Sequence, residues 1–260
     1  MMSDEDIKEY HNLGKAIKHN DKYTYVDATR TEEHGSRLYD ILGARLPSVT
    51  TILGKTKDQQ FIKDWKAKVG EKEADRIKNL SSNRGTAMHK FLEHYILGTG
   101  YDDLTGLGQE AKAMAEKVIE YGLTPVEEWY GSEVTLYYPG LYAGSTDLVC
   151  LHDGVETIVD FKQSNRPKKK EWIEDYYLQI AAYAMAHDYV HGSKIRQGLI
   201  MMCTPDLYYQ EFRITDHELR SYKHKFLKRL DMYHELIYDE KERAKVELRA
   251  TDFTNNEQDT

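Results

Sequence analysis

Cysteine is scarce in this sequence of 260 residues, which contains only Cys150 and Cys203. Each lies in an apolar run and is expected to be a small buried side chain. Two thiols are too few for a four-cysteine zinc site, and too few for an iron–sulfur cluster. A disulfide between them is not expected in a reducing compartment. The sequence therefore predicts neither a disulfide-stabilised protein nor a cluster protein.

Long apolar runs are also missing. No stretch of about 18 apolar residues occurs, so we expect no transmembrane helix and no membrane partner. The first six residues, MMSDED, are acidic and lack the basic start and apolar segment of a secretory signal. They lack the arginine-rich, acid-poor character of a mitochondrial transit peptide as well. The expected location is the cytoplasm.

Positive charge is in deficit, because 36 lysines and arginines face 44 aspartates and glutamates, giving a net charge of −8. This balance argues against a protein that coats nucleic acid along its whole surface. It leaves open a protein that binds nucleic acid in one basic groove. Bound metal cations would offset some of the carboxylates locally.

The periodicity of the apolar residues changes along the chain. Helical spacing predicts helices near residues 59–69, 71–80, 84–97 and 109–121. Three strand-like runs follow at residues 133–138, 142–151 and 155–161. A long helix is predicted over residues 170–190, then a second pair of strands at 199–203 and 208–214, and a capped helix from residue 215 onward. We expect an α+β protein with an α/β-type core, in which helices flank a central mixed β-sheet and the N-terminal portion is helical. The expected division is an extension over residues 1–45, one domain over residues 46–248 and a polar, disordered tail over residues 249–260.

The dipeptide Asp153-Gly154 separates two of these strands and is a strong signal for a two-residue hairpin turn. Counting outward from that turn pairs Asp147 directly with Asp160. Asp160 and Lys162 are two residues apart on one strand, so their side chains point to the same face. Cross-strand neighbours have Cβ atoms about 5 Å apart, close enough for two carboxylates to share a divalent cation.

An ordinary hairpin with one cross-strand salt bridge is the alternative interpretation. Two facing aspartates count against it, because like charges directly opposite each other destabilise a sheet. The flanking runs are almost entirely apolar, and buried acids without a partner are costly. A metal ion or a catalytic lysine would resolve both problems. Mg²⁺ is the expected ion for carboxylate ligands, with Mn²⁺ as a substitute.

Two helical pairs could add to this site. His89 and Glu93 are four residues apart and share a helix face, which fits either a functional pair or a solvated polar face. Gln179 and Tyr183 have the same spacing, and ordinary helix packing explains them at least as well.

The densest basic segment runs from Arg166 to Lys170. Such a run is usually a solvated face, but beside a metal site it could hold phosphates of a bound strand. The residues that could do so are Arg166, Lys168, Lys169 and Lys170. Trp172 could stack on an unpaired base or pack in the core.

Four motifs in order resemble those of the PD-(D/E)XK nuclease superfamily, in its RecB-like exonuclease branch. They are Arg-Gly-Thr-x-x-His-x-x-x-Glu at 84–93, Gly-x-x-Asp at 144–147, Asp-x-Lys at 160–162 and Gln-x-x-x-Tyr at 179–183. Each motif alone is weak, but four at workable spacing are specific. The resemblance covers roughly residues 45 to 215.

The resemblance implies a restriction-endonuclease-like core over residues 46–248. It implies that His89, Asp147 and Asp160 bind a metal ion, with the backbone carbonyl of Phe161 as a further ligand, and that Lys162 is the catalytic lysine. Arg84, Glu93, Gln179 and Tyr183 would support the site or the bound strand. The paired cysteines of iron–sulfur relatives are missing, and so is the targeting of mitochondrial ones, which favours a bacterial or phage setting.

Two departures from the superfamily pattern occur near the site. Thr146 stands where the superfamily name has proline, and Gln163 stands where relatives often carry a small hydroxyl residue. Neither departure removes an expected metal ligand.

Three functions fit these residues. The first is an Mg²⁺-dependent DNA exonuclease that prefers single-stranded ends and acts in replication, recombination or repair; the strand preference rests on the resemblance alone. The second is an endonuclease that cuts at restriction sites or junctions. The third is a non-catalytic DNA-binding or assembly module, against which the complete set of Asp147, Asp160 and Lys162 argues.

Overall fold

The computed structural model describes residues 17–33 and 35–256, and for Phe61 and residues 241–256 it describes the backbone alone. Residues 1–16, which are part of the predicted extension, and residues 257–260 of the predicted tail lie outside the described part of the chain. No described helix is long and apolar enough to cross a membrane.

A six-stranded mixed sheet forms the centre of the protein, as predicted, with strand order β1-β5-β6-β7-β8-β9. The strands are β1 (Lys18–His19), β5 (Val126–Tyr138), β6 (Tyr142–His152), β7 (Val155–Gln163), β8 (Gln197–Cys203) and β9 (Tyr209–Thr215). β5, β6 and β7 form an antiparallel meander, whereas β8 pairs with β7 in parallel. The parallel pair requires a crossover, which is supplied by helix α6 (Glu174–His191) after the short 3-10 helix η2 (Lys170–Trp172).

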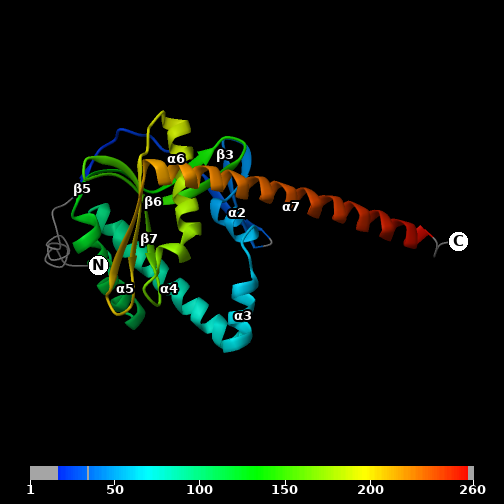
Figure 1. Ribbon diagram of the computed structural model, residues 1–260, viewed down its shortest axis with the longest axis horizontal. Coiled ribbons are helices and arrows are strands. Elements are labelled where there is room, and N and C mark those ends of the chain that lie inside the picture. The colour runs from blue at the N-terminus through cyan, green and yellow to red at the C-terminus, as the bar shows by residue number, and fades with distance from the viewer. Residues whose placement is uncertain (1–16, 34, 257–260) are drawn as a thin grey trace.

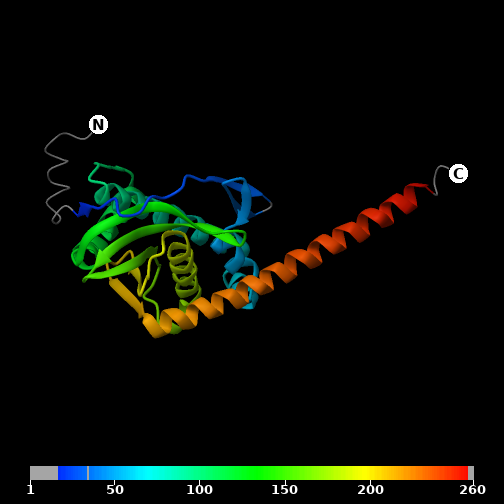
Figure 2. The same ribbon diagram turned by 90° about the horizontal axis from the view of Figure 1, so that it is seen from above.

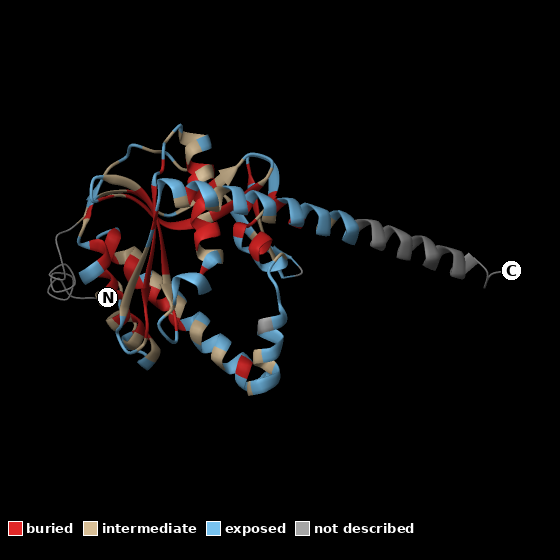
Figure 3. Cartoon of the chain, in the orientation of Figure 1, coloured by how far each residue is buried: buried red, intermediate tan, exposed pale blue. Residues whose placement is uncertain are grey.

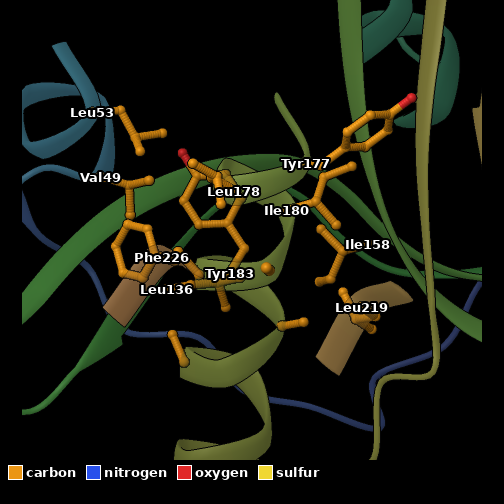
Figure 4. Close-up of a cluster of buried hydrophobic side chains, with 14 of the residues drawn as sticks. Val49, Leu53, Leu136, Ile158, Tyr177, Leu178, Ile180, Tyr183, Leu219 and Phe226 are labelled. Atoms are coloured by element: carbon orange, nitrogen blue, oxygen red, sulfur yellow. The ribbon is translucent and has the colours of Figure 1, made fainter. Parts of the chain in front are cut away.

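Helices cover both faces of this sheet, because side chains on successive strand residues point to opposite sides. Leu148 and Cys150 pack towards α4 (Glu71–Ile96), α5 (Gly106–Val118) and the π-helical turn η1 (Ile119–Leu123). Val149 belongs instead to the core shared with α6 and the long C-terminal helix α7 (Asp216–Asn256). Figure 2 shows these layers, with the sheet between α4 on one side and α6 and α7 on the other. Figure 3 shows the strands buried between them, and Figure 4 shows the side chains of the α6 core.

A second, three-stranded sheet precedes the helices. It consists of β2 (Thr29–Glu33), β3 (Ser36–Ile41) and β4 (Ala44–Pro47), all antiparallel. Ser48 joins this small sheet to β6 by an isolated bridge with Ala143, and its hydroxyl accepts the amide of Thr51 as the N-cap of α2 (Val49–Lys55). The small sheet was not predicted from the sequence, and the predicted boundary between residues 45 and 46 falls inside β4.

The helices differ from their predicted bounds in two places. The predicted helices at 71–80 and 84–97 are one continuous helix, α4, which follows α3 (Gln60–Val69). Figures 1 and 3 show that α3 and the first turns of α4 project from the domain and are largely exposed. The tail predicted to be disordered from residue 249 is helical as far as Asn256, the end of α7. That helix extends well away from the domain in both views of the ribbon.

Candidate active site

A cleft of about 760 Å³ lies where the small sheet, α4, the β5–β7 meander and α6 meet. Every element that surrounds it contributes polar side chains. Those from the core are His89, Glu93, Glu133, Asp147, Asp160, Lys162, Gln179 and Tyr183. The cleft therefore collects residues that are more than 90 positions apart in the sequence.

The hairpin that carries the two aspartates has the predicted register. Asp153 and Gly154 both have positive φ values, of 49° and 73°, as a two-residue type I′ turn requires. Cross-strand pairing is regular as far as Leu148 and Val159, and one further step places Asp147 opposite Asp160. The sequence pattern thus located both carboxylates correctly.

Side chains replace the regular ladder at the two aspartates. Asp147 Oδ2 accepts the backbone N–H of Phe161 at 2.5 Å, and the buried hydroxyl of Thr146 donates to the carbonyl of Val159 at 3.4 Å. The first contact fixes the orientation of the Asp147 carboxylate and leaves Oδ1 facing the cleft side of β6. Both contacts tie β6 to β7 where the catalytic groups are expected.

Lys162 forms a buried ion pair with Asp160, and its ammonium lies 5.1 Å from the centre of the Tyr176 ring. Burial lowers the pKa of Lys162, but the carboxylates of Asp160 and Asp147 outweigh burial and raise it, so the amine is protonated. Burial raises the pKa of Asp160 to about 6 despite the lysine. Burial would also raise the pKa of Asp147, but His89 outweighs it and the pKa is lowered. Two neighbouring carboxylates therefore differ in acidity, as in many acid–base and metal sites.

His89 reaches the same point from α4. Its Nδ1 lies 3.4 Å from Asp147 Oδ1 and 3.8 Å from Glu133 Oε1, and its Nε2 lies 2.9 Å from the Phe161 carbonyl oxygen. Burial lowers the pKa of His89, but the two carboxylates raise it to about 10. The imidazole thus donates Nε2–H to the β7 backbone and turns Nδ1 towards the acids. The Phe161 carbonyl, expected as a metal ligand, accepts this hydrogen bond.

Glu133 is a site residue that the sequence interpretation missed. The pairs Ser132–Leu148 and Val134–Thr146 place it opposite Asp147 on β5. Its φ is +53°, a left-handed conformation that costs a non-glycine residue on the order of 1–3 kcal/mol. Counting outward from Pro139-Gly140 as a two-residue turn would have placed Ser132 opposite Asp147, because the loop between β5 and β6 spans three residues and pairs Tyr138 with Tyr142. Strain of this kind commonly marks functional positions.

The residues present fit a divalent metal ion. Ligand atoms of His89, Glu133 and Asp147 all lie within 4.8 Å of one another. Imidazole nitrogen and carboxylate oxygen are donors that Mn²⁺ accepts, and the oxygens suit Mg²⁺. Asp160 Oδ2 is buried and pairs with the Lys162 ammonium. Three carboxylates thus lie beside one lysine and one histidine, and a bound cation would neutralise the remaining negative charge.

Gln179 and Tyr183 line the cleft from α6, where Gln179 Nε2 donates to Tyr183 Oη at 3.1 Å. A Cβ atom at Gly144 would lie 2.6 Å from Tyr183 Cε1, so only glycine leaves room for this ring. The Gly-x-x-Asp and Gln-x-x-x-Tyr motifs are thus in direct contact. The buried pair therefore packs α6 against the strand of Asp147 along one wall of the cleft.

Gly85 lies in the middle of α4 rather than near a helix start. A Cβ at this position would lie 3.3 Å from Gln163 Cγ. Glycine therefore lets the helix of His89 approach the residue that follows Lys162. The predicted helix over residues 84–97 would place this glycine near a helix start, whereas the helix begins at Glu71.

Arg84 is buried and is not among the residues that line the cleft. Its guanidinium donates to Gln163 Oε1 at 3.0 Å, to Glu110 Oε1 at 3.2 Å and to Asn165. These contacts join α4 to α5 and to the segment after β7. Arg84 therefore supports the site through its neighbours and does not face a strand in the cleft.

Replacing Arg84 with lysine is expected to destabilise the protein. One ammonium cannot reproduce a guanidinium that bonds to three partners, and each lost charged hydrogen bond costs about 1.5–3 kcal/mol. The measurement is the midpoint of thermal unfolding. The matched control is Arg76→Lys, an exposed arginine that pairs with Glu73 of its own helix turn and should leave the midpoint unchanged. Equal midpoints for the two variants would contradict this role.

The basic segment lies outside the cleft. None of its four cationic residues lines the cleft, and their contacts with phosphates of a bound strand stay a prediction. Lys170 pairs with Glu218 at 2.5 Å, and Lys169 lies 5.3 Å from the centre of the Trp172 ring. Trp172 is 63% exposed, so the alternative of core packing is wrong. Arg166 is exposed, and the Lys168 amide donates to Gln210 Oε1 at 2.7 Å.

Comparison with known proteins gives relatives of one kind. The chain is 30% identical over 204 residues to mitochondrial genome maintenance exonuclease 1 of Mus musculus, covering 73% of this chain and 59% of that protein. It is 29% identical over 205 residues to the Homo sapiens protein of the same name, covering 73% and 58%. The chain thus spans less than two thirds of the length of these relatives. No family model matches it.

Solved structures show weaker likeness. A candidate exonuclease of Eubacterium rectale has a TM-score of 0.45 at 18% identity, over 61% of this chain and 66% of that one. An alkaline exonuclease of Laribacter hongkongensis has a TM-score of 0.31 at 16% identity, over 62% and 85%. Likeness at this level does not bear on function. The chain is thus similar in sequence to the mitochondrial genome maintenance exonucleases, and its mixed sheet with the two-aspartate hairpin fits a PD-(D/E)XK nuclease.

Proposed function

We propose that the chain is a metal-dependent exonuclease that hydrolyses phosphodiester bonds in DNA, preferring single-stranded ends. The observation that carries this proposal is the meeting of Asp147, Asp160, Lys162 and His89 in one cleft. The names of the sequence relatives support it independently. A role in DNA replication, recombination or repair and a cytoplasmic, bacterial or phage setting remain predictions.

The proposed metal ligands are His89, Asp147 and Asp160, with Glu133 added from β5 and the Phe161 carbonyl beside them. A bound Mg²⁺ would supply Lewis acidity, both to the attacking water and to a non-bridging phosphate oxygen. Mn²⁺ would substitute, because it accepts the same oxygen and nitrogen donors. An iron–sulfur cluster has no place in this proposal, since both cysteines are buried in the core.

The protein's own groups provide charge and orientation. Lys162 is held protonated by two carboxylates, so its ammonium can stabilise negative charge that develops on the phosphate. The Phe161 amide fixes the Asp147 carboxylate, and the Phe161 carbonyl fixes the His89 ring. Such hydrogen bonds to metal ligands set their orientation and basicity. Gln179 and Tyr183 keep β6 in place behind them.

Digestion of end-labelled DNA tests the function. We expect loss of terminal nucleotides from linear single strands in Mg²⁺, and no product in EDTA. Circular single-stranded DNA should stay intact, and its cleavage would identify an endonuclease instead. A matched RNA strand measures the preference for DNA. Absence of metal-dependent cleavage with every DNA form would favour a non-catalytic binding module.

Replacing Glu133 with glutamine is expected to weaken binding of Mn²⁺ by about tenfold or more, because one charged donor is lost from the ligand set. Titration followed by the electron paramagnetic resonance signal of free Mn²⁺ measures this without requiring activity. Glu128→Gln is the matched control, since Glu128 lies on the same strand and pairs with Lys18 and Asn20 instead. Unchanged Mn²⁺ affinity in the Glu133 variant would remove Glu133 from the proposed ligands.

A further inference from the structure

We infer that one face of the small β2–β3–β4 sheet binds phosphates of the DNA strand whose end lies at the active site, through Arg30 and Arg37. This inference rests on the proposed function and names the surface that holds its substrate. The basic segment at 166–170, which the sequence offered for this role, does not line the cleft. Other cations do, among them Arg30 and Arg37 of the small sheet.

Register places the two arginines on the same face of the small sheet. Arg30 pairs directly with Tyr39, and Arg37 lies two residues before Tyr39 on β3. Because strand side chains alternate between faces, all three point to one side. All three line the cleft that also contains Asp147 and Lys162. The small sheet therefore forms a wall of the cleft, and that wall carries two guanidinium groups.

The arginines of this sheet differ in their partners. No hydrogen bond or ion pair of the Arg30 or Arg37 side chain is found within the described residues, although Glu32 is paired with Arg37 in register. Arg45, on the opposite face, forms ion pairs with Glu33 and with Asp40, the latter at 3.9 Å. Among the described residues, Arg30 and Arg37 thus have no partner that competes with a ligand, whereas Arg45 on the outer face is already neutralised.

The small sheet is fixed relative to the proposed metal ligands. Tyr39 is 4% exposed and packs in a cluster with Ile41, Leu46 and Ala143 of β6. Ala143 also bridges Ser48, and it lies four residues before Asp147 on the same strand. The arginines are consequently mounted on a surface that is packed against the catalytic strand. A site built on packed strands holds its geometry better than one on a loop.

Acidic and basic side chains lie on different walls of the cleft, which agrees with this role. The carboxylates of Glu133, Asp147 and Asp160 surround the proposed metal, which would receive the phosphate to be cleaved. Neighbouring phosphates of the same strand carry negative charge that those carboxylates would repel. Guanidinium groups on another wall bind phosphate with two parallel hydrogen bonds and favour a strand over an isolated nucleotide.

The test compares Arg30→Gln/Arg37→Gln with Arg45→Gln, all three substitutions being on the small sheet. Binding of a fluorescein-labelled single-stranded DNA is measured by anisotropy with Ca²⁺ in place of Mg²⁺, at several salt concentrations. Two lost phosphate contacts should weaken binding at low salt and flatten the slope of log affinity against log salt by about 1.4, at about 0.7 per contact. Arg45→Gln should keep both the affinity and the slope of the unaltered protein.

An unchanged slope in the double variant would overturn the inference, provided that its thermal unfolding midpoint matches that of the unaltered protein. If the double variant fails to fold, the single Arg30→Gln variant, changed at an exposed position, should flatten the slope by about 0.7. These outcomes are independent of cleavage. An unaltered protein that binds DNA with the steeper slope but never cuts it would refute the nuclease proposal and leave this surface in place.

Discussion

Replacing Lys162 with methionine is expected to lower the cleavage rate of single-stranded DNA on the order of 10²–10³-fold, the usual effect of losing one stabiliser of transition-state charge. The ammonium lines the cleft beside the buried Asp160 and is kept protonated, so it is the cation best placed to meet negative charge at the phosphate. Methionine keeps most of the side-chain volume while it removes that charge. Single-turnover digestion of end-labelled DNA measures the effect on chemistry.

Two further measurements make the Lys162 result specific. Affinity for the DNA strand in Ca²⁺ should fall much less than the rate, because a transition-state contact contributes little to binding of the ground state. Lys117→Met is the matched control. Lys117 lies on α5 and pairs with Glu120 of η1, so this variant should cleave DNA at the normal rate. Cleavage by the Lys162 variant at the normal rate would exclude this lysine from the chemistry.

Replacing Phe226 with alanine is expected to lower the free energy of unfolding by about 3–5 kcal/mol, which is the range for buried phenylalanine. Phe226 is fully buried in the core shared by α6 and α7 (Figure 4). Its ring meets Tyr142 edge-on, with 4.9 Å between the ring centres. Because Tyr142 begins β6, the cavity would loosen the strand of Asp147 as well. A drop of roughly 6–20 °C in the unfolding midpoint is expected.

The neighbouring residue provides the control for Phe226. Leu227 is 38% exposed, and Leu227→Ala should change stability by no more than about 0.5 kcal/mol. Chemical denaturation of both variants gives the two free energies. A loss below about 1 kcal/mol for Phe226→Ala would mean that α7 adds little to the core and that the domain tolerates its detachment.

The part of the site that the sequence revealed is the part governed by local rules. An Asp-Gly turn fixes the register of a hairpin, and the period of two then determines which side chains share a face. That reasoning located Asp147, Asp160 and Lys162 without any long-range information. The mixed sheet with flanking helices was also predicted, because strand-like and helical runs alternate in the second half of the chain.

Long-range packing decided what the sequence left open. In isolation, Gly85 resembles a residue at a helix boundary. Helix α4 nevertheless continues through it, and the missing Cβ leaves room for the side chain of Gln163 on β7. The small sheet was missed because Arg30 and Arg37 interrupt the apolar alternation that identifies strands. Those arginines face a cleft, where polar residues are the rule. Charge density alone pointed to the segment at 166–170, which the fold places elsewhere.

Thr146 occupies the position at which the superfamily pattern has proline. The threonine is completely buried, and its hydroxyl reaches the carbonyl of Val159, directly beside the two aspartates. The hairpin keeps its register with this residue, so proline is not needed at this position to bring the two aspartates opposite each other. A search pattern that insists on it would pass over proteins like this one. In this chain, the spacing of the two aspartates from the Asp-Gly turn identifies the site without that proline.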